Sequence, residues 1–192
     1  MIQKWVFEKL PLEGAYKISP FYATDNRGLL CKDYSKEIFE KNGISYDLKE
    51  TFYTKSFKGV IRALHFQVIK EQPKLMRCIQ GHVFHVIVDL RPDSKTFKQW
   101  MSFDLSDDNF TEILVPAGFA NGYLALEDSI MAYKCSEKFY GEYDGGIKWD
   151  DPTIGIKWPL AQIGGRDRLI LAEKDMQLPS FLQFFESSNL KD

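Results

Sequence analysis

The sequence is poor in the residues that mark several classes of protein. It has three cysteines, Cys31, Cys78 and Cys135, which is an odd number, and no CxxC spacing occurs. A disulfide framework and a zinc knuckle are therefore not expected. Free thiols of this kind are typical of a reducing compartment, so we expect a cytoplasmic protein.

Charge of one sign and long apolar runs are also missing. The chain carries 25 Lys and Arg against 27 Asp and Glu, a net charge of −2, which gives no basic footprint for nucleic acid. No stretch approaches the roughly 18 uncharged apolar residues of a membrane span, and the first ten residues include Lys4, Glu8 and Lys9. We expect no signal peptide, no membrane span and no nucleic-acid partner for this chain of 192 residues, most simply one domain.

Strand patterns dominate from about residue 50 to residue 135. Short apolar or alternating runs bounded by turn residues are typical of strands. They occur at Phe52–Thr54, Gly59–Ile61, Leu75–Ile79, Val83–Val88 and Ile113–Val115. Their number and spacing predict an all-β barrel or sandwich.

Turns and helices fill the remaining pattern. Gln80-Gly81 predicts a hairpin, and Pro116-Ala117-Gly118 predicts another turn. Helical signal is confined to Ser35–Asn42, where Ser35 is a candidate cap and Ile38 and Phe39 would face inward, and to Leu178–Leu190. The helices are expected to be accessories to the strands.

The chain has only three histidines, and one of them lies in a promising setting. His65 follows Arg62 by three residues and precedes Lys74 by nine. An imidazole titrates near neutrality, so with cations nearby it suits removal of a proton from a carbon next to a carbonyl group. Such a reaction also needs donors that stabilise the enolate oxygen.

The run from Arg62 to Gln67 resembles the Arg-Gly-Leu-His-Tyr-Gln motif of the dTDP-4-dehydrorhamnose 3,5-epimerase family. Further blocks follow in that family's order and cover the chain from about Phe21 to Asp175: Arg27-Gly28, Gln72–Leu75, Val88–Arg91, Pro116–Ala120, Tyr133-Lys134, Trp149–Pro152, Gly155–Pro159 and Glu173–Asp175. The resemblance implies a cupin jelly roll with short accessory helices, a homodimer that exchanges strands or loops near the active site, and no cofactor. It implies one domain over 1–192, with N-terminal strands and loop in 1–50, the jelly-roll core in about 50–160 and a tail in 161–192.

The resemblance also implies an epimerisation mechanism. The substrate would be a nucleotide-diphosphate-linked 4-keto-6-deoxy sugar used in surface polysaccharide biosynthesis. His65 would be the base, oriented by Asp175, and Lys74 would stabilise the enolate. Tyr133 matches the family's proton donor and would return a proton to C3 or C5 from the opposite face of the sugar.

Substrate contacts follow from the same matches. The predicted binding residues are Arg27, Arg62, Gln67, Asn121, Glu50 and Lys32. Several positions differ from the usual family residue. Near the sugar pocket, Ala63 replaces a glycine, Asn121 a histidine, His85 an aspartate and Phe139 a tyrosine. Near the nucleotide, the residues that contact thymine in the family are replaced by Leu30, Lys32, Glu50 and Phe52. Because these last changes alter base recognition, a GDP-linked 4-keto hexose or heptose stands beside the dTDP-linked hexose as a substrate.

The sequence allows four other interpretations. His82 and His85 suggest a metal, but a spacing of three on a strand places them on opposite faces, so no metal is predicted. Asp150 and Asp151 precede a proline and are interpreted as turn formers rather than paired catalytic carboxylates. A nucleotide-sugar 3,4-ketoisomerase of the same fold and a non-catalytic nucleotide-sugar-binding cupin remain as alternative functions.

Overall fold

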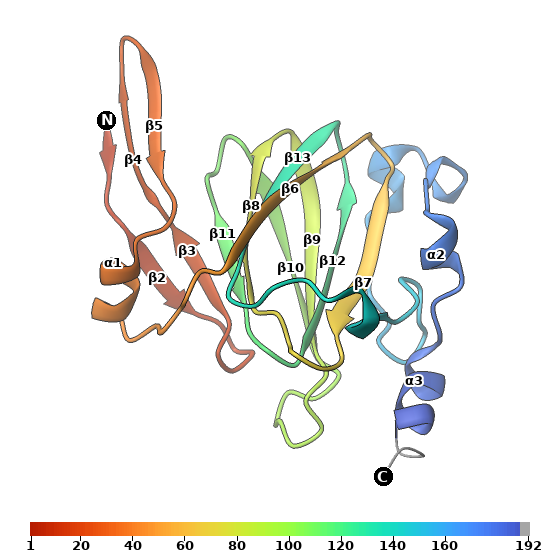
Figure 1. Cartoon of the computed structure of the whole chain (residues 1–192). Coiled ribbons are helices and arrows are strands. Elements are labelled where there is room, and N and C mark those ends of the chain that lie inside the picture. The colour runs from red at the N-terminus through yellow and green to blue at the C-terminus, as the bar shows by residue number, and fades with distance from the viewer. Residues whose placement is uncertain (189–192) are drawn as a thin grey trace.

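The computed structural model describes residues 1–188 and consists mainly of two facing antiparallel β-sheets (Figure 1). The six-stranded sheet has the order β2 (Val6–Lys9), β3 (Tyr16–Ser19), β11 (Glu112–Val115), β8 (Lys74–Gln80), β13 (Ser129–Cys135) and β6 (Glu50–Ser56). The five-stranded sheet has the order β10 (Trp100–Ser106), β9 (His82–Asp89), β12 (Phe119–Ala125), β7 (Ile61–Gln67) and β14 (Asp144–Gly146). The predicted all-β jelly-roll class is confirmed.

Apolar side chains from both sheets fill the space between them. Met76 and Met131 of one sheet pack in the same buried cluster as Ile87 and Tyr123 of the other. Strand β12 is buried along its whole length because the C-terminal segment covers its outer face. A strand buried on both faces shows no alternation of polar and apolar residues, which explains why the sequence pattern did not reveal it.

The turn at Gln80-Gly81 was predicted to close a hairpin, and that prediction is wrong. Strand β8 pairs with β11 and β13, whereas β9 pairs with β10 and β12, so Gly81 links two different sheets. Gly81 has φ 79°, and an added Cβ would lie 2.3 Å from the backbone oxygen of Asp128. Glycine is therefore required at this turn, where the chain passes from one sheet to the other.

The N-terminal segment projects from the sandwich. Strands β1 (Ile2–Gln3), β4 (Phe21–Asp25) and β5 (Gly28–Lys32) form a separate three-stranded sheet that extends away from the two large sheets (Figure 1). Helix α1 (Lys36–Lys41) confirms the predicted helix and buries Phe39, although Ser35 makes no side-chain capping bond.

The C-terminal segment covers the outer face of the five-stranded sheet. It contains the short 3₁₀ helices η2 (Leu160–Ile163) and η3 (Arg166–Arg168) and the helices α2 (Glu173–Met176) and α3 (Phe181–Ser188); η1 (Gly141–Tyr143) precedes β14. Helix α3 lies within the predicted Leu178–Leu190 range, whose last two positions fall outside the described residues.

Two further observations concern this end of the chain. Asp151 forms a turn, as predicted, by accepting backbone hydrogen bonds from Thr153 and Ile154, and it also accepts one from Phe181 at the start of α3.

Within residues 1–188, no helix is long and apolar enough to cross a membrane.

Candidate active site

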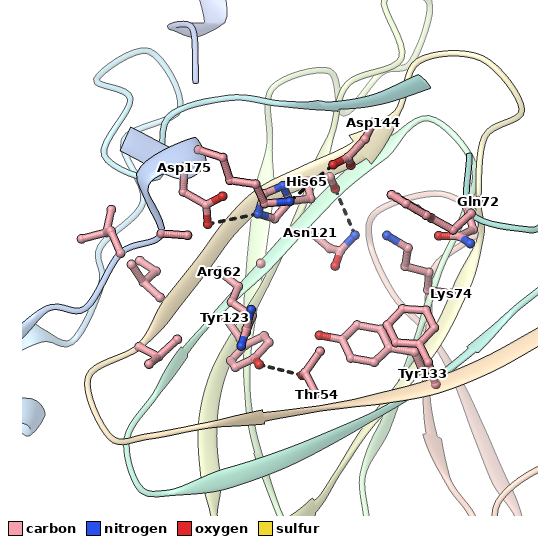
Figure 2. A pocket seen from close by; sticks show the side chains of 18 of the residues that line it. Thr54, Arg62, His65, Gln72, Lys74, Asn121, Tyr123, Tyr133, Asp144 and Asp175 are labelled. Carbon is pink, nitrogen blue, oxygen red and sulfur yellow. Dashed lines mark hydrogen bonds and ion pairs between the residues drawn. The ribbon is translucent and has the colours of Figure 1, made fainter. Parts of the chain in front are cut away.

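A cavity of about 410 Å³ opens between the two sheets. Side chains from both sheets and from α2 point into it (Figure 2). Of the predicted site residues, the cavity wall contains six: Arg62, His65, Lys74, Asn121, Tyr133 and Asp175. The fold therefore brings together all four residues predicted to be catalytic, although they come from separate parts of the chain.

His65 and Asp175 form a pair at one wall of the cavity. His65 lies on β7, and its Nε2 is 3.3 Å from Oδ2 of Asp175 on α2. The Asp175 side chain is 4% exposed and that of His65 is 22% exposed. A buried carboxylate bonded to one ring nitrogen fixes the tautomer and leaves the other nitrogen to act as a base.

The backbone around His65 is held by neighbouring strands. Gly146 of β14 pairs with His65 on one side, and the side chain of Asn121 donates a hydrogen bond from Nδ2 to the His65 carbonyl at 3.2 Å on the other. Gly122 follows at an irregularity in the pairing, where an added Cβ would lie 2.4 Å from Cβ of Ala63. This close approach of β12 and β7 lets Asn121 and Tyr123 both line the cavity.

Tyr133 forms the opposite wall. It lies on β13 of the six-stranded sheet and is 7% exposed. Its ring stacks on Phe52 of β6 with centroids 4.5 Å apart. Burial raises the pKa of the Tyr133 phenol well above its ordinary value, so the phenol is neutral at physiological pH.

Two cations complete the wall. Burial lowers the pKa of the Lys74 ammonium, and the charge of Asp144 partly opposes this effect. Arg62 donates from Nε to the hydroxyl of Ser56 at 3.1 Å. Lys174 also lines the cavity, and its Nζ lies 3.5 Å from Oδ2 of Asp144, so this ion pair joins α2 to β14.

Five polar residues of the cavity wall were not predicted as site residues: Thr54, Gln72, Tyr123, Asp144 and Lys174. The hydroxyl of Tyr123 lies 2.9 Å from that of Thr54 and 2.8 Å from that of Ser56. Two of them, Tyr123 and Thr54, could have been predicted from their sequence positions. Tyr123 lies two residues after Asn121 on one strand and Thr54 two residues after Phe52 on another, and residues two apart on a strand share a face.

Gln67 was predicted to bind substrate, but the structure gives it another task. It is 4% exposed and does not line the cavity. Its Nε2 donates to the carbonyls of Lys70 (2.6 Å) and Lys138 (3.2 Å), and its Oε1 accepts from the amide of Tyr140 (2.6 Å). Every one of these contacts is with backbone, so Gln67 ties together the two loops at the cavity mouth.

The remaining predicted binding residues are not at the cavity of their own chain. Arg27 lies at the tip between β4 and β5, where its guanidinium bonds Asp25, and Lys32 ends β5. This hairpin points away from the cavity (Figure 1). Glu50 does not line the cavity either, and its Oε2 accepts a hydrogen bond from the backbone amide of Phe139 at 2.7 Å.

The other two histidines do not act together. His82 bonds Asp104 at 3.1 Å near the surface, whereas His85 is fully buried, so they point to opposite sides of β9 as predicted. No group of three or more His, Cys, Asp or Glu side chains that could hold a metal ion occurs within residues 1–188. Burial lowers the pKa of His85 to about 3, so its ring is neutral.

Fold and cavity define a jelly-roll protein whose cavity is lined by a histidine from one sheet and a tyrosine from the other. Comparison with known proteins identifies the family. The family model for dTDP-4-dehydrorhamnose 3,5-epimerase matches residues 9–183. The protein of that name from Methanothermobacter thermautotrophicus is 46% identical over 170 residues, which are 88% of this chain and 90% of the relative.

Solved structures give the same result. The dTDP-4-dehydrorhamnose 3,5-epimerase of Bacillus anthracis, with TDP and pyrophosphate bound, superposes with a TM-score of 0.86 at 36% identity, over 93% of this chain and 100% of the other. The Legionella pneumophila epimerase in complex with dTDP-4-keto-L-rhamnose has a TM-score of 0.87 at 30% identity, over 98% of this chain and 95% of the other. The chain belongs to the dTDP-4-dehydrorhamnose 3,5-epimerase family. It is therefore an isomerase of nucleotide-sugar metabolism.

Proposed function

We propose that this protein epimerises C3 and C5 of a dTDP-linked 4-keto-6-deoxyhexose. The observation that carries this proposal is the placement of the His65–Asp175 pair and Tyr133 on opposite sheets around one cavity. Inversion at a carbon requires removal of a proton from one face and its return to the other. A base and an acid on facing walls meet that requirement.

His65 starts the reaction. Its free ring nitrogen takes the proton from the carbon next to the C4 ketone, the C–H electron pair moves into the C–C bond, and negative charge develops on the ketone oxygen. Asp175 stabilises the imidazolium through Nε2. Lys74 presents its ammonium from the adjoining wall and stabilises the enolate oxygen.

Tyr133 completes the inversion. Its O–H bond breaks as a new C–H bond forms on the opposite face, and the ketone is restored. The phenol is protonated and shielded from bulk water, as a proton donor must be before the enolate forms. Arg62, which lines the same cavity, is available for the diphosphate.

Incubation with dTDP-4-keto-6-deoxyglucose in D2O tests this function. An epimerase incorporates deuterium at C3 and C5 and changes the configuration at both carbons. Movement of the ketone from C4 to C3 would indicate a 3,4-ketoisomerase, and tight binding without exchange would indicate a non-catalytic binding protein.

A GDP-linked 4-keto hexose or heptose is the second candidate substrate. The observation in its favour is that Leu30, which is 61% exposed on the projecting hairpin, offers no ring to stack on a base, while Lys32 is a cation. Glu50 has one carboxylate oxygen committed to Phe139 and one left for a donor on a base edge. Parallel assays with dTDP- and GDP-linked forms of one 4-keto sugar, compared by kcat/KM, decide between the two bases.

We also propose that the protein is a homodimer in which the hairpin of one subunit reaches the cavity of the other. Leu29, Leu30 and Tyr53 are exposed, and β6 is an edge strand of its sheet. Exposed apolar residues beside an unpaired edge favour association with a second strand. The hairpin would then deliver Arg27 and Lys32 to the partner's substrate.

Subunit mixing tests this arrangement. Arg27→Ala and His65→Asn are each expected to be inactive alone. In a mixed dimer, one cavity would combine an intact His65 with an intact Arg27 of the partner subunit, so activity should return. Absence of recovery in a verified mixed dimer would place Arg27 outside the partner's site.

The product retains its ketone and must be reduced before use. We propose that a reductase consumes it for surface polysaccharide synthesis. The three unpaired cysteines suit the reducing cytoplasm.

A further inference from the structure

Hydroxyl groups beside Tyr133 form a row that the proposed reaction does not yet use. The row runs from Arg62 on β7 through Ser56, Tyr123 and Thr54 to Tyr133 on β13, and it crosses between the two sheets because Tyr123 lies on β12 and the two other hydroxyls on β6. Arg62 Nε lies 3.1 Å from Ser56 Oγ, which lies 2.8 Å from Tyr123 Oη, which lies 2.9 Å from Thr54 Oγ1. The hydroxyl of Tyr133 is directed toward Thr54 (Figure 2).

The chemistry at one end gives this row a direction. A guanidinium only donates hydrogen bonds, so Ser56 must accept from Arg62. Ser56 is 2% exposed and Tyr123 is 1% exposed, so their protons need acceptors within the protein. If Ser56 donates to Tyr123 and Tyr123 donates to Thr54, both protons have an acceptor.

The opposite direction is unfavourable. If Tyr123 donated to Ser56, the Ser56 proton would be left without an acceptor beside the donating N–H of Arg62. In the favourable direction, Thr54 can donate its own proton to Tyr133. The Tyr133 oxygen then accepts from Thr54, and its O–H is free to point at the substrate.

We propose that Ser56, Tyr123 and Thr54 form a directional hydroxyl chain, anchored at Arg62, that aims the Tyr133 proton at the substrate and stabilises the phenolate left behind. This inference rests on the proposed function, in which the Tyr133 O–H bond breaks as the new C–H bond forms. The charge that leaves the enolate arrives on the Tyr133 oxygen, where the Thr54 hydroxyl donates to it. Tyr123 and Thr54 are positioning residues, because they act through Tyr133.

The groups around Tyr133 shift its pKa in both directions. Burial is the largest effect and raises the pKa, and Tyr123 also raises it, both by its charge and by hydrogen bonding. Hydrogen bonding by Thr54 and the charge of Arg62 act in the opposite direction and favour the phenolate. A donor chain that ends in a fixed cation therefore partly offsets the cost of forming a buried anion.

Variants that remove single hydroxyls test the chain. Tyr123→Phe keeps the ring, and Thr54→Val keeps the shape of the side chain while Thr54→Ser keeps the hydroxyl. A hydrogen bond to a charged group contributes about 1.5–3 kcal/mol, so Thr54→Val, which removes the donor to the phenolate, should slow epimer formation by about 10- to 100-fold. Tyr123→Phe removes a bond between neutral groups, which contributes about 1 kcal/mol, and should slow it by about fivefold. Thr54→Ser should stay within about threefold of wild type, an interval of well under 1 kcal/mol.

The measurement in D2O separates this role from a structural one. In both disruptive variants, deuterium incorporation with the original configuration should continue, and KM should change little, because His65 and the binding residues are untouched. Wild-type epimerisation in Tyr123→Phe, or equal losses of incorporation and epimerisation in Thr54→Val, would overturn the proposal. Melting curves establish that each variant is folded.

A neutron structure of the deuterated protein tests the direction without any substrate. The Ser56 deuteron should point to Tyr123, and the Tyr123 deuteron to Thr54. The reverse order would refute the chain even if the protein proved to be an epimerase. If no 4-keto sugar incorporated deuterium, the proposed function would be refuted. The deuteron positions in the neutron structure would then still show whether the hydroxyl chain has the proposed direction.

Discussion

The two walls of the cavity surround the proposed base and the proposed acid in different ways. On the wall that carries His65, the base wall, His65 is partly exposed and has one carboxylate partner, Asp175, which is supplied by a four-residue helix far along the chain. On the acid wall, Tyr133 is buried between strands β6 and β8 and lies beside hydroxyl groups. One wall uses a charged partner, and the other uses burial and neutral donors.

This difference matches what each group must do. A base has to be unprotonated and close to substrate, and a carboxylate behind the ring stabilises the cation that it becomes. An acid has to hold its proton until the enolate has formed, and burial keeps a phenol neutral. Substitutions on the two walls are therefore expected to have different effects on deuterium incorporation and on epimer formation.

The largest effect is expected for His65→Asn, which removes the base and keeps a side chain of similar polarity. Deuterium incorporation at C3 and C5 should fall by about 1,000-fold, because general base catalysis contributes that order of rate enhancement. Nucleotide affinity, measured by calorimetry with dTDP, should stay within a few fold. Substantial exchange in this variant would remove His65 from its assigned role.

Tyr133→Phe should divide the reaction into two halves. Exchange at the face of His65 continues, whereas epimer formation should fall by about 100-fold or more, because no acid stands on the other face. NMR analysis of the sugar in D2O reports label and configuration together. Epimerisation at the wild-type rate would move the acid to another group, with Tyr140 or a water held by Asn121 as the next candidates.

Asp175→Ala should impair the base wall without abolishing it. His65 remains, but its tautomer and orientation are no longer fixed, and exchange and epimerisation should both fall by about 100-fold. Equal loss of the two processes would contrast with the separation expected for Tyr133→Phe. If Asp175→Ala retained full exchange, the 3.3 Å contact with His65 would have no catalytic role.

A smaller effect concerns His85, a buried histidine that has neither kind of partner. Its pKa is lowered to about 3 by burial, against about 6.5 in an unfolded chain. Between these values the unfolded chain binds a proton that the folded protein does not, so stability is lost as pH falls. From pH 7 to pH 5 this loss should be about 2 kcal/mol.

His85→Phe removes that proton-linked loss. Urea denaturation at both pH values should show a smaller decrease in the free energy of unfolding for the variant than for wild type. His65 and His82 are present in both proteins, so the difference isolates His85. The same decrease in both would show that His85 protonates in the folded protein.

The smallest effect, no change, is expected from chelation. An enolate stabilised by Lys74 has its cation supplied by the protein, so exhaustive EDTA treatment should leave epimerisation intact. If EDTA abolished activity and one specific divalent ion restored it, a metal ion would take part in the reaction.

The sequence predicted the all-β class and the four residues that meet at the cavity, but not the whole path of the chain. His65 and Tyr133 were identified through motifs and both line the cavity, while their roles in proton transfer stay predictions. Strand β12 escaped notice since both of its faces are buried, and Gly81 was assigned to a hairpin because a local turn does not reveal which sheet the chain enters.

The supporting residues were harder to predict for a physical reason. Thr54 and Tyr123 lie far apart in the chain, and their hydroxyls meet only because two facing sheets bring them within 2.9 Å. Gln67 lies in the catalytic motif, yet its amide points to loop backbone. A motif identifies which residues belong together but not the direction in which each side chain points.

Gln67 also has a consequence for how the cavity mouth can diversify. Its amide group contacts only main-chain atoms of residues 70, 138 and 140, and every amino acid type supplies the carbonyl groups. Side chains at 138 and 140 can thus change without loosening the two loops, provided that residue 140 keeps its N–H, whereas residue 70, with φ 56°, must also tolerate a left-handed backbone. The loop that carries Phe139, which lines the cavity, can therefore vary in sequence while its backbone stays in place.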